Sequence, residues 1–294
     1  MTFAEAVRNY EKRCAECGVP EETVMAFLVE IAQTERYNLY LHYDEEMPQE
    51  LAGKFSAGME RILNQEPMAH VLGYSWFYGY KFTVNGDVLI PRPETEELCA
   101  KILAGIDRIF PEGKVNCVDV GTGSGAIAVT LACEEPRVIM DATDISEPAL
   151  ETAKLNAANN HADIRFYAGD MLKPLIEQGN RYDVLVCNPP YIPQDETMER
   201  SVVDFEPHVA LFGGEDGLRF YREVFADCRK VLKETAFMAF EMGWNQRKAM
   251  SALVRETLPE AEFEIRKDMN GKDRMLFVYF NCPGAEERGN GSDE

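Results

Sequence analysis

The sequence of 294 residues is poor in positive charge and has no long apolar segment. It carries 30 lysine and arginine residues against 51 aspartate and glutamate residues, which gives a formal net charge of −21. A surface this negative repels a phosphate backbone, so we expect no direct, non-specific binding of nucleic acid. No run of about 18 apolar residues is present, so no membrane-spanning helix is predicted. The 46% of hydrophobic residues is enough to bury a core, which excludes a disordered chain.

The sequence also shows no pattern typical of a leader segment or of a set of metal ligands. The first residues, MTFAEAVRNYEKRC, contain no apolar stretch after a basic segment, so we expect no secretory signal and eight reduced thiols in a cytoplasmic protein. Cys14 and Cys17 form a Cys-x-x-Cys pair, but no second pair follows at the spacing of a zinc site. Cys117 and Cys187 lie in apolar runs and are interpreted as core residues. No metal site is predicted.

Hydrophobic patterning divides the chain into four parts. Residues 1–73 show helical spacing of apolar side chains and carry six basic against thirteen acidic residues, a balance of −7. Residues 74–90 are aromatic and rich in strand-forming residues, and Asn85-Gly86 predicts the turn of a β-hairpin that links two domains. Residues 91–282 alternate between strand and helix patterns, and residues 283–294 form a polar, acidic tail that we expect to be disordered.

The alternating region predicts an α/β domain with a parallel, doubly wound sheet. We predict helices over 148–159 and 216–233. The short turn Asn-Gly-Lys-Asp joins the last two predicted strands and indicates an antiparallel edge. The predicted strands are 115–120, 138–143, 164–168, 182–188, 236–242, 262–267 and 274–280.

A glycine-rich loop, Gly121-Thr122-Gly123-Ser124-Gly125, follows the first predicted strand of the sheet. Glycines at this place allow a tight turn and a close approach of the backbone to a ligand. The spacing differs from the dinucleotide fingerprint, and the Lys-Ser/Thr of a phosphate-binding P-loop is missing. Asp119, just before the loop, would repel a pyrophosphate and attract an ammonium group.

Three residues at the ends of the next two strands extend this pattern. Asp144 ends the second strand, where an acidic group hydrogen-bonds a ribose diol in such sheets. Asp170 and Met171 follow the third strand and are placed to border an adenine. A ribose, an adenine and a cationic amino-acid tail together indicate S-adenosylmethionine as cofactor. The alternative is a glycine-containing turn with surface carboxylates.

The segment Asn188-Pro189-Pro190-Tyr191 ends the fourth strand, at the edge where parallel sheets bind ligands. The prolines stop the strand and hold the neighbouring carbonyl groups in place. The side-chain oxygen of Asn188 and the carbonyl of Pro189 can therefore accept both hydrogens of one planar –NH₂ group. Both acceptors act most strongly as positive charge develops on that nitrogen, so they favour the transition state of a methyl transfer. Tyr191 offers a flat wall for the planar group.

The combination of these motifs resembles the HemK/PrmC family, the protein-(glutamine-N5) methyltransferases that modify peptide chain release factors. The resemblance implies a Rossmann-like class I methyltransferase domain whose cofactor, S-adenosylmethionine, becomes S-adenosylhomocysteine. It implies cofactor contacts by Gly121–Gly125, Asp144 and Asn188, and a glutamine of a Gly-Gly-Gln loop held by Asn188–Tyr191. The matching segments are EPMAHVLGY (66–74), LIPRPETEEL (89–98), DVGTGSGAIA (119–128), NPPYIP (188–193), DFEPHVAL (204–211) and EMGW (241–244).

Two further expectations concern the substrate. Arg92 is a candidate substrate-binding residue at the mouth of the site, or it braces Glu94 at the start of a helix. A short glutamine loop offers little contact area, so residues 1–73 are expected to dock the body of the release factor, and the enzyme is expected to be a monomer.

A DNA adenine amino-methyltransferase could use the same Asn-Pro-Pro-Tyr chemistry. It would have to flip a base through many phosphate contacts, however, and residues 74–294 carry a balance of −14. A scaffold without catalytic activity is a third possibility, and the intact set of motifs argues against it.

Overall fold

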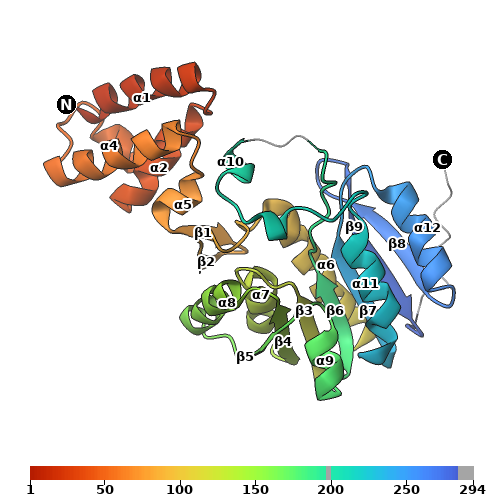
Figure 1. The fold of residues 1–294 in the computed structure, drawn as a ribbon. Coiled ribbons are helices and arrows are strands. Elements are labelled where there is room, and N and C mark those ends of the chain that lie inside the picture. Colours follow the sequence, from red (N-terminus) through yellow and green to blue (C-terminus); the bar gives the residue numbers. More distant parts are fainter. Residues whose placement is uncertain (197–199, 284–294) are drawn as a thin grey trace. The chain divides into compact units, whose positions relative to one another are not determined.

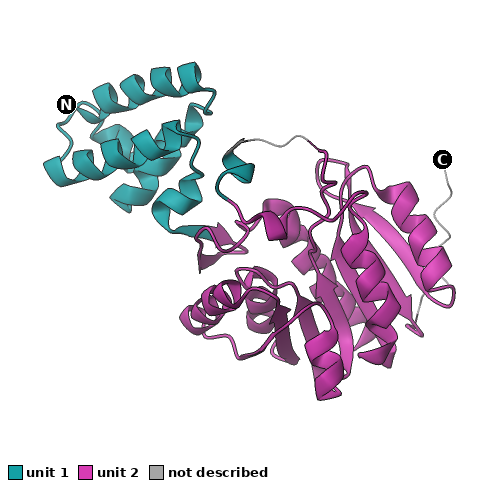
Figure 2. Cartoon of the chain, viewed as in Figure 1, with its two compact units in different colours: residues 1–75, 198–205 teal, residues 76–197, 206–294 magenta. Residues whose placement is uncertain are grey.

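The computed structural model describes residues 1–196 and 200–283, which form two compact units (Figure 2). We call residues 1–75 with 200–205 the helical unit, and residues 76–196 with 206–283 the sheet unit. Segment 200–205 belongs with the N-terminal helices, although the sequence analysis assigned it to the same domain as the sheet.

The helical unit is built from short amphipathic helices. Helix α1 begins with a capping box, in which Thr2 and Glu5 each bond the other's backbone N–H, and it ends at Gly18 in a left-handed conformation. The first five helices confirm the helical pattern predicted for residues 1–73. They are α1 (Phe3–Cys17), α2 (Glu22–Ala32), α3 (Arg36–Leu41), α4 (Gln49–Leu63) and α5 (Met68–Leu72), and the unit also contains α10 (Arg200–Val203).

Close packing of α2 against α4 fixes the core of this unit. Phe27 stacks on Phe55 with ring centroids 6.2 Å apart. Gly58 lies against the Phe27 ring, and a Cβ atom at this position would collide with it. The absence of a side chain at Gly58 therefore lets the two helices approach each other.

A hairpin of β1 (Tyr74–Phe77) and β2 (Tyr80–Thr83) follows the N-terminal helices. The turn predicted at Asn85-Gly86 was wrong: the turn lies at Tyr78-Gly79, whose φ angles of 52° and 81° fit a two-residue hairpin turn. Asn85 instead uses its side-chain oxygen to accept the backbone N–H of Asp87 at 2.9 Å.

The sheet unit contains a seven-stranded sheet in the order β5-β4-β3-β6-β7-β9-β8 (Figure 1). The strands from β5 to β7 are parallel, and β9 is antiparallel to both β7 and β8. The predicted α/β sheet with an antiparallel edge is confirmed. The strands are β3 (Val115–Val120), β4 (Val138–Asp144), β5 (Ile164–Ala168), β6 (Tyr182–Cys187), β7 (Leu232–Glu241), β8 (Glu262–Lys267) and β9 (Asp273–Phe280).

Helices cover both faces of this sheet. Because successive residues of a strand point to opposite faces, each central strand contributes side chains to two separate cores. One core contains Val184 and Val186 of β6 with side chains from α6, α7 and α8, and the other contains Leu185 and Cys187 with side chains from α9, α11 and α12. Cys117 and Cys187 are buried in these cores, as predicted. The helices are α6 (Pro93–Ile109), α7 (Ala126–Glu134), α8 (Glu147–Asn159), α9 (Lys173–Gln178), α11 (Arg219–Asp227) and α12 (Arg247–Thr257), with 3₁₀ turns η1 (His208–Ala210) and η2 (Cys228–Lys230).

The predicted boundaries of α11 and the predicted start of β7 were wrong. The helix predicted over 216–233 begins at Arg219 and ends at Asp227, and it continues only as the 3₁₀ turn η2. Strand β7 begins at Leu232, four residues before the predicted start.

The described residues contain no helix that is long and apolar enough to cross a membrane. Of the tail that was predicted to be disordered, residues 284–294 lie outside the described residues.

Candidate active site

The carboxyl ends of the parallel strands bring the two main motifs to one edge of the sheet. Val120 of β3 is paired with Thr143 of β4 on one side and with Cys187 of β6 on the other. The glycine-rich loop, Asp144 and Asn188 directly follow or end these strands. Segments from three distant parts of the sequence therefore meet at the topological switch point, where open parallel sheets bind ligands. We call the part after β3, β4 and β5 the cofactor edge, and the part after β6 and β7 the acceptor edge.

The glycine-rich loop adopts a conformation that requires its glycines. Gly121, Gly123 and Gly125 have φ angles of 73°, 54° and 80°, which other residues rarely adopt. The N–H of Gly123 donates to Oδ2 of Asp144 at 2.8 Å, and a Cβ at Gly125 would lie 3.1 Å from the Cβ of Ala153. The loop is thus held close to both β4 and α8.

Asp119 is a buried carboxylate with one unused oxygen. Its Oδ2 accepts the hydroxyl of Thr122 at 2.6 Å, whereas its Oδ1 has no hydrogen-bond partner among the described residues. Burial raises the pKa of Asp119 to about 7. A cationic group that reached Oδ1 would complete the hydrogen bonding and stabilise the ionised form.

Asn156 of α8 braces the glycine-rich loop, and the sequence analysis did not identify it. Its Nδ2 donates to the carbonyl of Ser124 at 2.8 Å and to the carbonyl of Thr83 at 3.0 Å, and its Oδ1 accepts the N–H of Thr83. One buried amide therefore connects the loop to strand β2. Because these partners are separated by 32 and 73 residues, local sequence patterns gave no signal for the contact.

The acidic residues after β4 and β5 lie side by side. Asp144 accepts the N–H groups of Gly123 and Ser146, at 2.8 and 2.9 Å, and burial raises its pKa. The N–H of Gly169 donates to the Asp144 carbonyl at 2.9 Å, which places Asp170 and Met171 next to this strand end. The Asp170 carboxylate is paired with Lys173 Nζ at 2.5 Å. Met171 has a φ angle of 48° and packs, half-buried, against the core.

At the acceptor edge, the side chain of Asn188 is oriented by a buried glutamate. Nδ2 of Asn188 donates to Oε2 of Glu241 at 3.1 Å, and Thr95 Oγ1 donates to the same oxygen at 2.6 Å. The hydroxyl of Tyr191 donates to Oε1 of Glu241 at 3.2 Å. None of the described residues donates to Asn188 Oδ1, so this acceptor is available to a ligand.

A second glycine-containing loop packs closely against the backbone of the Asn-Pro-Pro-Tyr segment. Cβ atoms at Gly213 or Gly217 would collide with the carbonyl oxygens of Pro190 and Tyr191, respectively. Gln246 Nε2 donates to the Tyr191 carbonyl at 3.0 Å. The carbonyl of Pro189 accepts no hydrogen bond from the described residues and can serve as a second acceptor.

Arg92 is positioned by Glu206, not by the predicted partner Glu94. The Arg92 guanidinium contacts Oε1 of Glu206 at 2.5 Å, and the N–H of Ile90 donates to its Oε2 at 3.1 Å. Glu206 is almost fully buried, while the Arg92 side chain is about one-third exposed. Glu206 thereby ties the IPRPET segment to the FEP segment.

The sequence analysis missed Thr95, Glu206 and Glu241 as site residues. A signal was available for Glu241, because it is the one charged residue in the otherwise apolar run AFMAFEM at the end of a predicted strand. Thr95 and Glu206 carry no such local signal, because their hydrogen bonds to Glu241 and Arg92 span 146 and 114 residues.

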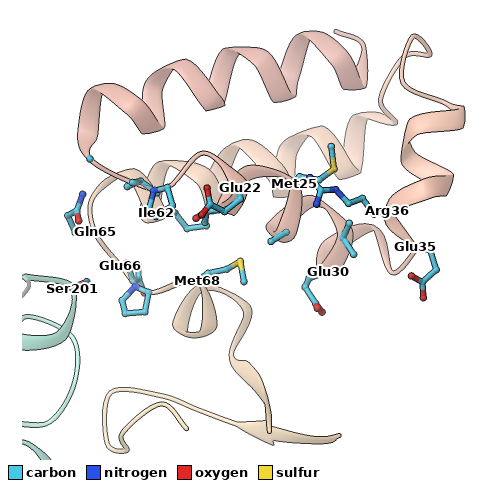
Figure 3. Close-up of a pocket in the computed structure, with 17 residues that line it drawn as sticks. Glu22, Met25, Glu30, Glu35, Arg36, Ile62, Gln65, Glu66, Met68 and Ser201 are labelled. Atoms are coloured by element: carbon cyan, nitrogen blue, oxygen red, sulfur yellow. The ribbon is translucent and has the colours of Figure 1, made fainter. Parts of the chain in front are cut away.

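The helical unit has a pocket of its own, with a volume of about 660 Å³ (Figure 3). Met25, Val29 and Ile62 contribute apolar surface, and Ser201 of α10 also lines it. The lining carries more acidic than basic side chains: Glu22, Glu30, Glu35 and Glu66 against Arg36. Within residues 1–196 and 200–283, no group of three His, Cys, Asp or Glu side chains could hold a metal ion.

Comparison with known proteins agrees with this geometry. A family model described as the PrmC N-terminal domain matches residues 5–73, and one described as the methyltransferase small domain matches residues 103–206. The chain is 41% identical to the release factor glutamine methyltransferase of Bacillus subtilis, over 94% of this chain and 96% of that protein. It is 39% identical to the enzyme of the same name from Bacillus anthracis, over 95% and 99% of the two chains. A methyltransferase from Pyrococcus furiosus shares the fold, with a TM-score of 0.52, 19% identity, and coverage of 76% of this chain and 98% of that one.

Proposed function

Because the chain belongs to the family of release factor glutamine methyltransferases, we propose that it methylates the side-chain amide nitrogen of the glutamine in the Gly-Gly-Gln loop of peptide chain release factors. The observation that carries this proposal is the Asn188 carboxamide, whose nitrogen is bound to Glu241 and whose oxygen is left for a ligand.

The cofactor edge fits S-adenosylmethionine, which supplies an electrophilic methyl group on a sulfonium sulfur. Asp119 Oδ1 is a buried oxygen to which none of the described residues donates a hydrogen bond, and it suits the ammonium group of the cofactor. The loop Gly121–Gly125 lets the backbone approach the ligand, and the Asp144 carboxylate retains acceptor capacity for the ribose hydroxyls. Asp170 and Met171 would border the adenine. Thr122 and Ser124 act through the loop, since the Thr122 hydroxyl is used by Asp119.

At the acceptor edge, Asn188 Oδ1 and the Pro189 carbonyl would accept the two hydrogens of the glutamine –NH₂. An amide nitrogen is a weak nucleophile because its lone pair is delocalised. The two acceptors become more favourable as positive charge develops on this nitrogen, so they stabilise the transition state more than the ground state. The nitrogen forms the N–C bond as the S–C bond breaks, and its extra proton passes to water.

The walls of the acceptor site come from Tyr191, Pro190 and Arg92. The hydroxyl of Tyr191 is held by Glu241, which fixes the ring as one wall for the planar amide. Pro190 keeps the backbone rigid, and the Arg92 guanidinium, tethered by Glu206, is available to the loop of the substrate.

Recognition of the whole release factor is assigned to the helical unit. Its pocket is lined by apolar side chains and by four glutamates, of which Glu66 is paired with Arg61 and Glu30 accepts the Tyr74 hydroxyl. The remaining excess of negative charge suits a basic segment of the partner whose side chains have apolar stems. We place the reaction in the cytoplasm, where translation takes place, and propose that one copy of the enzyme is sufficient for it.

Transfer of a labelled methyl group separates this function from the DNA alternative. The full chain is incubated with labelled S-adenosylmethionine and an intact release factor, the same factor with its loop glutamine replaced by alanine, or duplex DNA with adenine targets. We expect label only in the intact factor. Label in DNA, or equal label in the two release factors, would refute the proposal.

A further inference from the structure

A carboxamide can occupy a site in two orientations of nearly the same shape. Rotation of the Asn188 amide by half a turn exchanges Oδ1 and Nδ2, and the torsion that does so is soft. In one orientation Asn188 accepts a hydrogen from a substrate –NH₂ group. In the other it presents its own N–H groups to that nitrogen and repels its hydrogens. The proposed chemistry therefore requires something in the protein to select one orientation.

We propose that Glu241 is this positioning residue: its carboxylate, supported by Thr95, holds Nδ2 of Asn188 inward so that Oδ1 faces the substrate amide. This inference rests on the proposed function in one respect, because it takes Asn188 Oδ1 as the acceptor for the glutamine.

The Glu241 carboxylate is the acceptor in its hydrogen bonds to Thr95, Asn188 and Tyr191, as this role requires. An ionised carboxylate only accepts hydrogen bonds. Oε2 receives Thr95 Oγ1 at 2.6 Å and Asn188 Nδ2 at 3.1 Å, and Oε1 receives the Tyr191 hydroxyl at 3.2 Å. A flipped Asn188 would place Oδ1 against a carboxylate oxygen, so the flipped orientation is strongly disfavoured.

Burial strengthens this selection. Glu241 is 3% exposed, and burial raises its pKa, while the Thr95 hydroxyl and the positive charge of Arg274 favour its ionised form. Interactions of a charge are stronger in such an environment than in water. Thr95 Oγ1 also lies 3.5 Å from Asn188 Nδ2, so the hydroxyl can itself accept a hydrogen from the amide.

The fold brings these groups together from distant segments. Cys187 at the end of β6 is paired with Phe240 of β7, so Asn188 and Glu241 are the next residues of two neighbouring parallel strands. The hydroxyl of Tyr221 donates to the Glu241 carbonyl at 2.7 Å and fixes the backbone there. Thr95 comes from the first turn of α6.

Exchange of donor and acceptor tests this role directly. In Asn188→Asp two carboxylates face each other, and transfer should fall by about 10²-fold, the usual loss for a catalytic acceptor. In the double variant Asn188→Asp with Glu241→Gln, the introduced glutamine amide can donate to one oxygen of the introduced carboxylate and leave the other oxygen for the substrate. We expect this double variant to recover about tenfold in kcat over Asn188→Asp, a coupling typical of residues in contact.

A second carboxylate in the same sheet serves as the matched control. Asp141 of β4 is fully buried and accepts the Tyr182 hydroxyl at 2.6 Å, away from the edge that carries Asn188. Asp141→Asn should lower stability with kcat unchanged, whereas Glu241→Gln should lower kcat with the Kd of S-adenosylmethionine unchanged. Equal kcat losses in the two variants would overturn the proposal, and so would a double variant no more active than Asn188→Asp.

A spectroscopic readout keeps the positioning role separate from the reaction itself. The side-chain amide of Asn188 can be assigned in an NMR spectrum by its loss in Asn188→Asp. Its protons should lie downfield in the natural protein, because one bonds a carboxylate, and should move upfield in Glu241→Gln. An unchanged signal would refute the role of Glu241. If the signal moves but the natural protein does not methylate a release factor, only the proposed function fails.

Discussion

The cofactor edge and the acceptor edge are built in different ways, although they share one side of the same sheet. The cofactor edge uses backbone groups of a short glycine-rich loop and the acidic residues that end β4 and β5. At the acceptor edge, Asn188 depends on Thr95 and Glu241, which lie 93 and 53 residues away. Local signals therefore locate the main groups of the first edge, with Asn156 as a more distant support, whereas Thr95 and Glu241 of the second edge reach Asn188 only through the tertiary structure.

The largest expected effect separates the two edges. Asn188→Ala removes an acceptor that acts mainly in the transition state, so kcat should fall by about 10²–10³ while the cofactor Kd changes little. Single-turnover rates and calorimetry would measure the two quantities. Near-full turnover of the variant would contradict the role of the side-chain oxygen.

Substitution at the cofactor edge should show the opposite pattern. Asp144→Ala removes a carboxylate proposed to bind the ribose, and hydrogen bonds to charged groups contribute roughly 1.5–3 kcal/mol, so the Kd should weaken about 10- to 100-fold. The rate at saturating cofactor should change much less, because the ribose hydroxyls do not change charge during transfer. Asp144→Asn, which keeps one acceptor oxygen, is the matched control. An unchanged Kd in Asp144→Ala would show that the ribose is held elsewhere.

The loop and strand ends of the cofactor edge could be predicted from the sequence because each signal is local. Short apolar runs that alternate with helical patterns along the chain predicted β3, β4 and β6. The spacing of the glycines predicted the loop between β3 and α7. The turn at Tyr78-Gly79 was missed because Asn85-Gly86 is the stronger local turn signal, yet Asn85 forms an Asx turn instead. Thr95, Glu206 and Asn156 could not be predicted, since each acts through a partner that is adjacent only in the folded chain.

The pH dependence of cofactor binding probes Asp119. The pKa of this carboxyl is about 7 in the free protein, and a bound ammonium group favours its ionised form. Below pH 7 a proton must therefore leave on binding, so the Kd should rise by up to about tenfold per pH unit as the pH falls, and should level off above about pH 8. Calorimetry across this range would measure it, with Asp119→Asn as the variant expected to bind weakly and without pH dependence. The same slope in Asp119→Asn would assign the titration to another group.

The smallest effect is expected from changes in the pocket of the helical unit. Glu22→Lys with Glu35→Lys reverses two exposed charges of the lining, and the KM for an intact release factor should rise a few-fold, an effect that weakens at high salt. The rate with a short peptide that contains the glutamine loop should not change. Glu16→Lys with Glu50→Lys makes the same charge change on exposed positions outside the pocket. Equal KM values in these two double variants would argue against docking at the pocket.

The position of the transferred methyl group tests the central claim, that the acceptor edge is built to hold a carboxamide nitrogen, most directly. An intact release factor treated with the enzyme and S-adenosylmethionine would be digested and sequenced by tandem mass spectrometry. We predict a single methyl group on the side-chain nitrogen of the glutamine in the Gly-Gly-Gln loop, formed about 10²–10³ times more slowly when Asn188→Ala replaces the natural enzyme. A methyl group on a lysine, on an arginine or at any position outside the Gly-Gly-Gln loop would contradict the account. Modification by Asn188→Ala at the rate of the natural enzyme would contradict it as well.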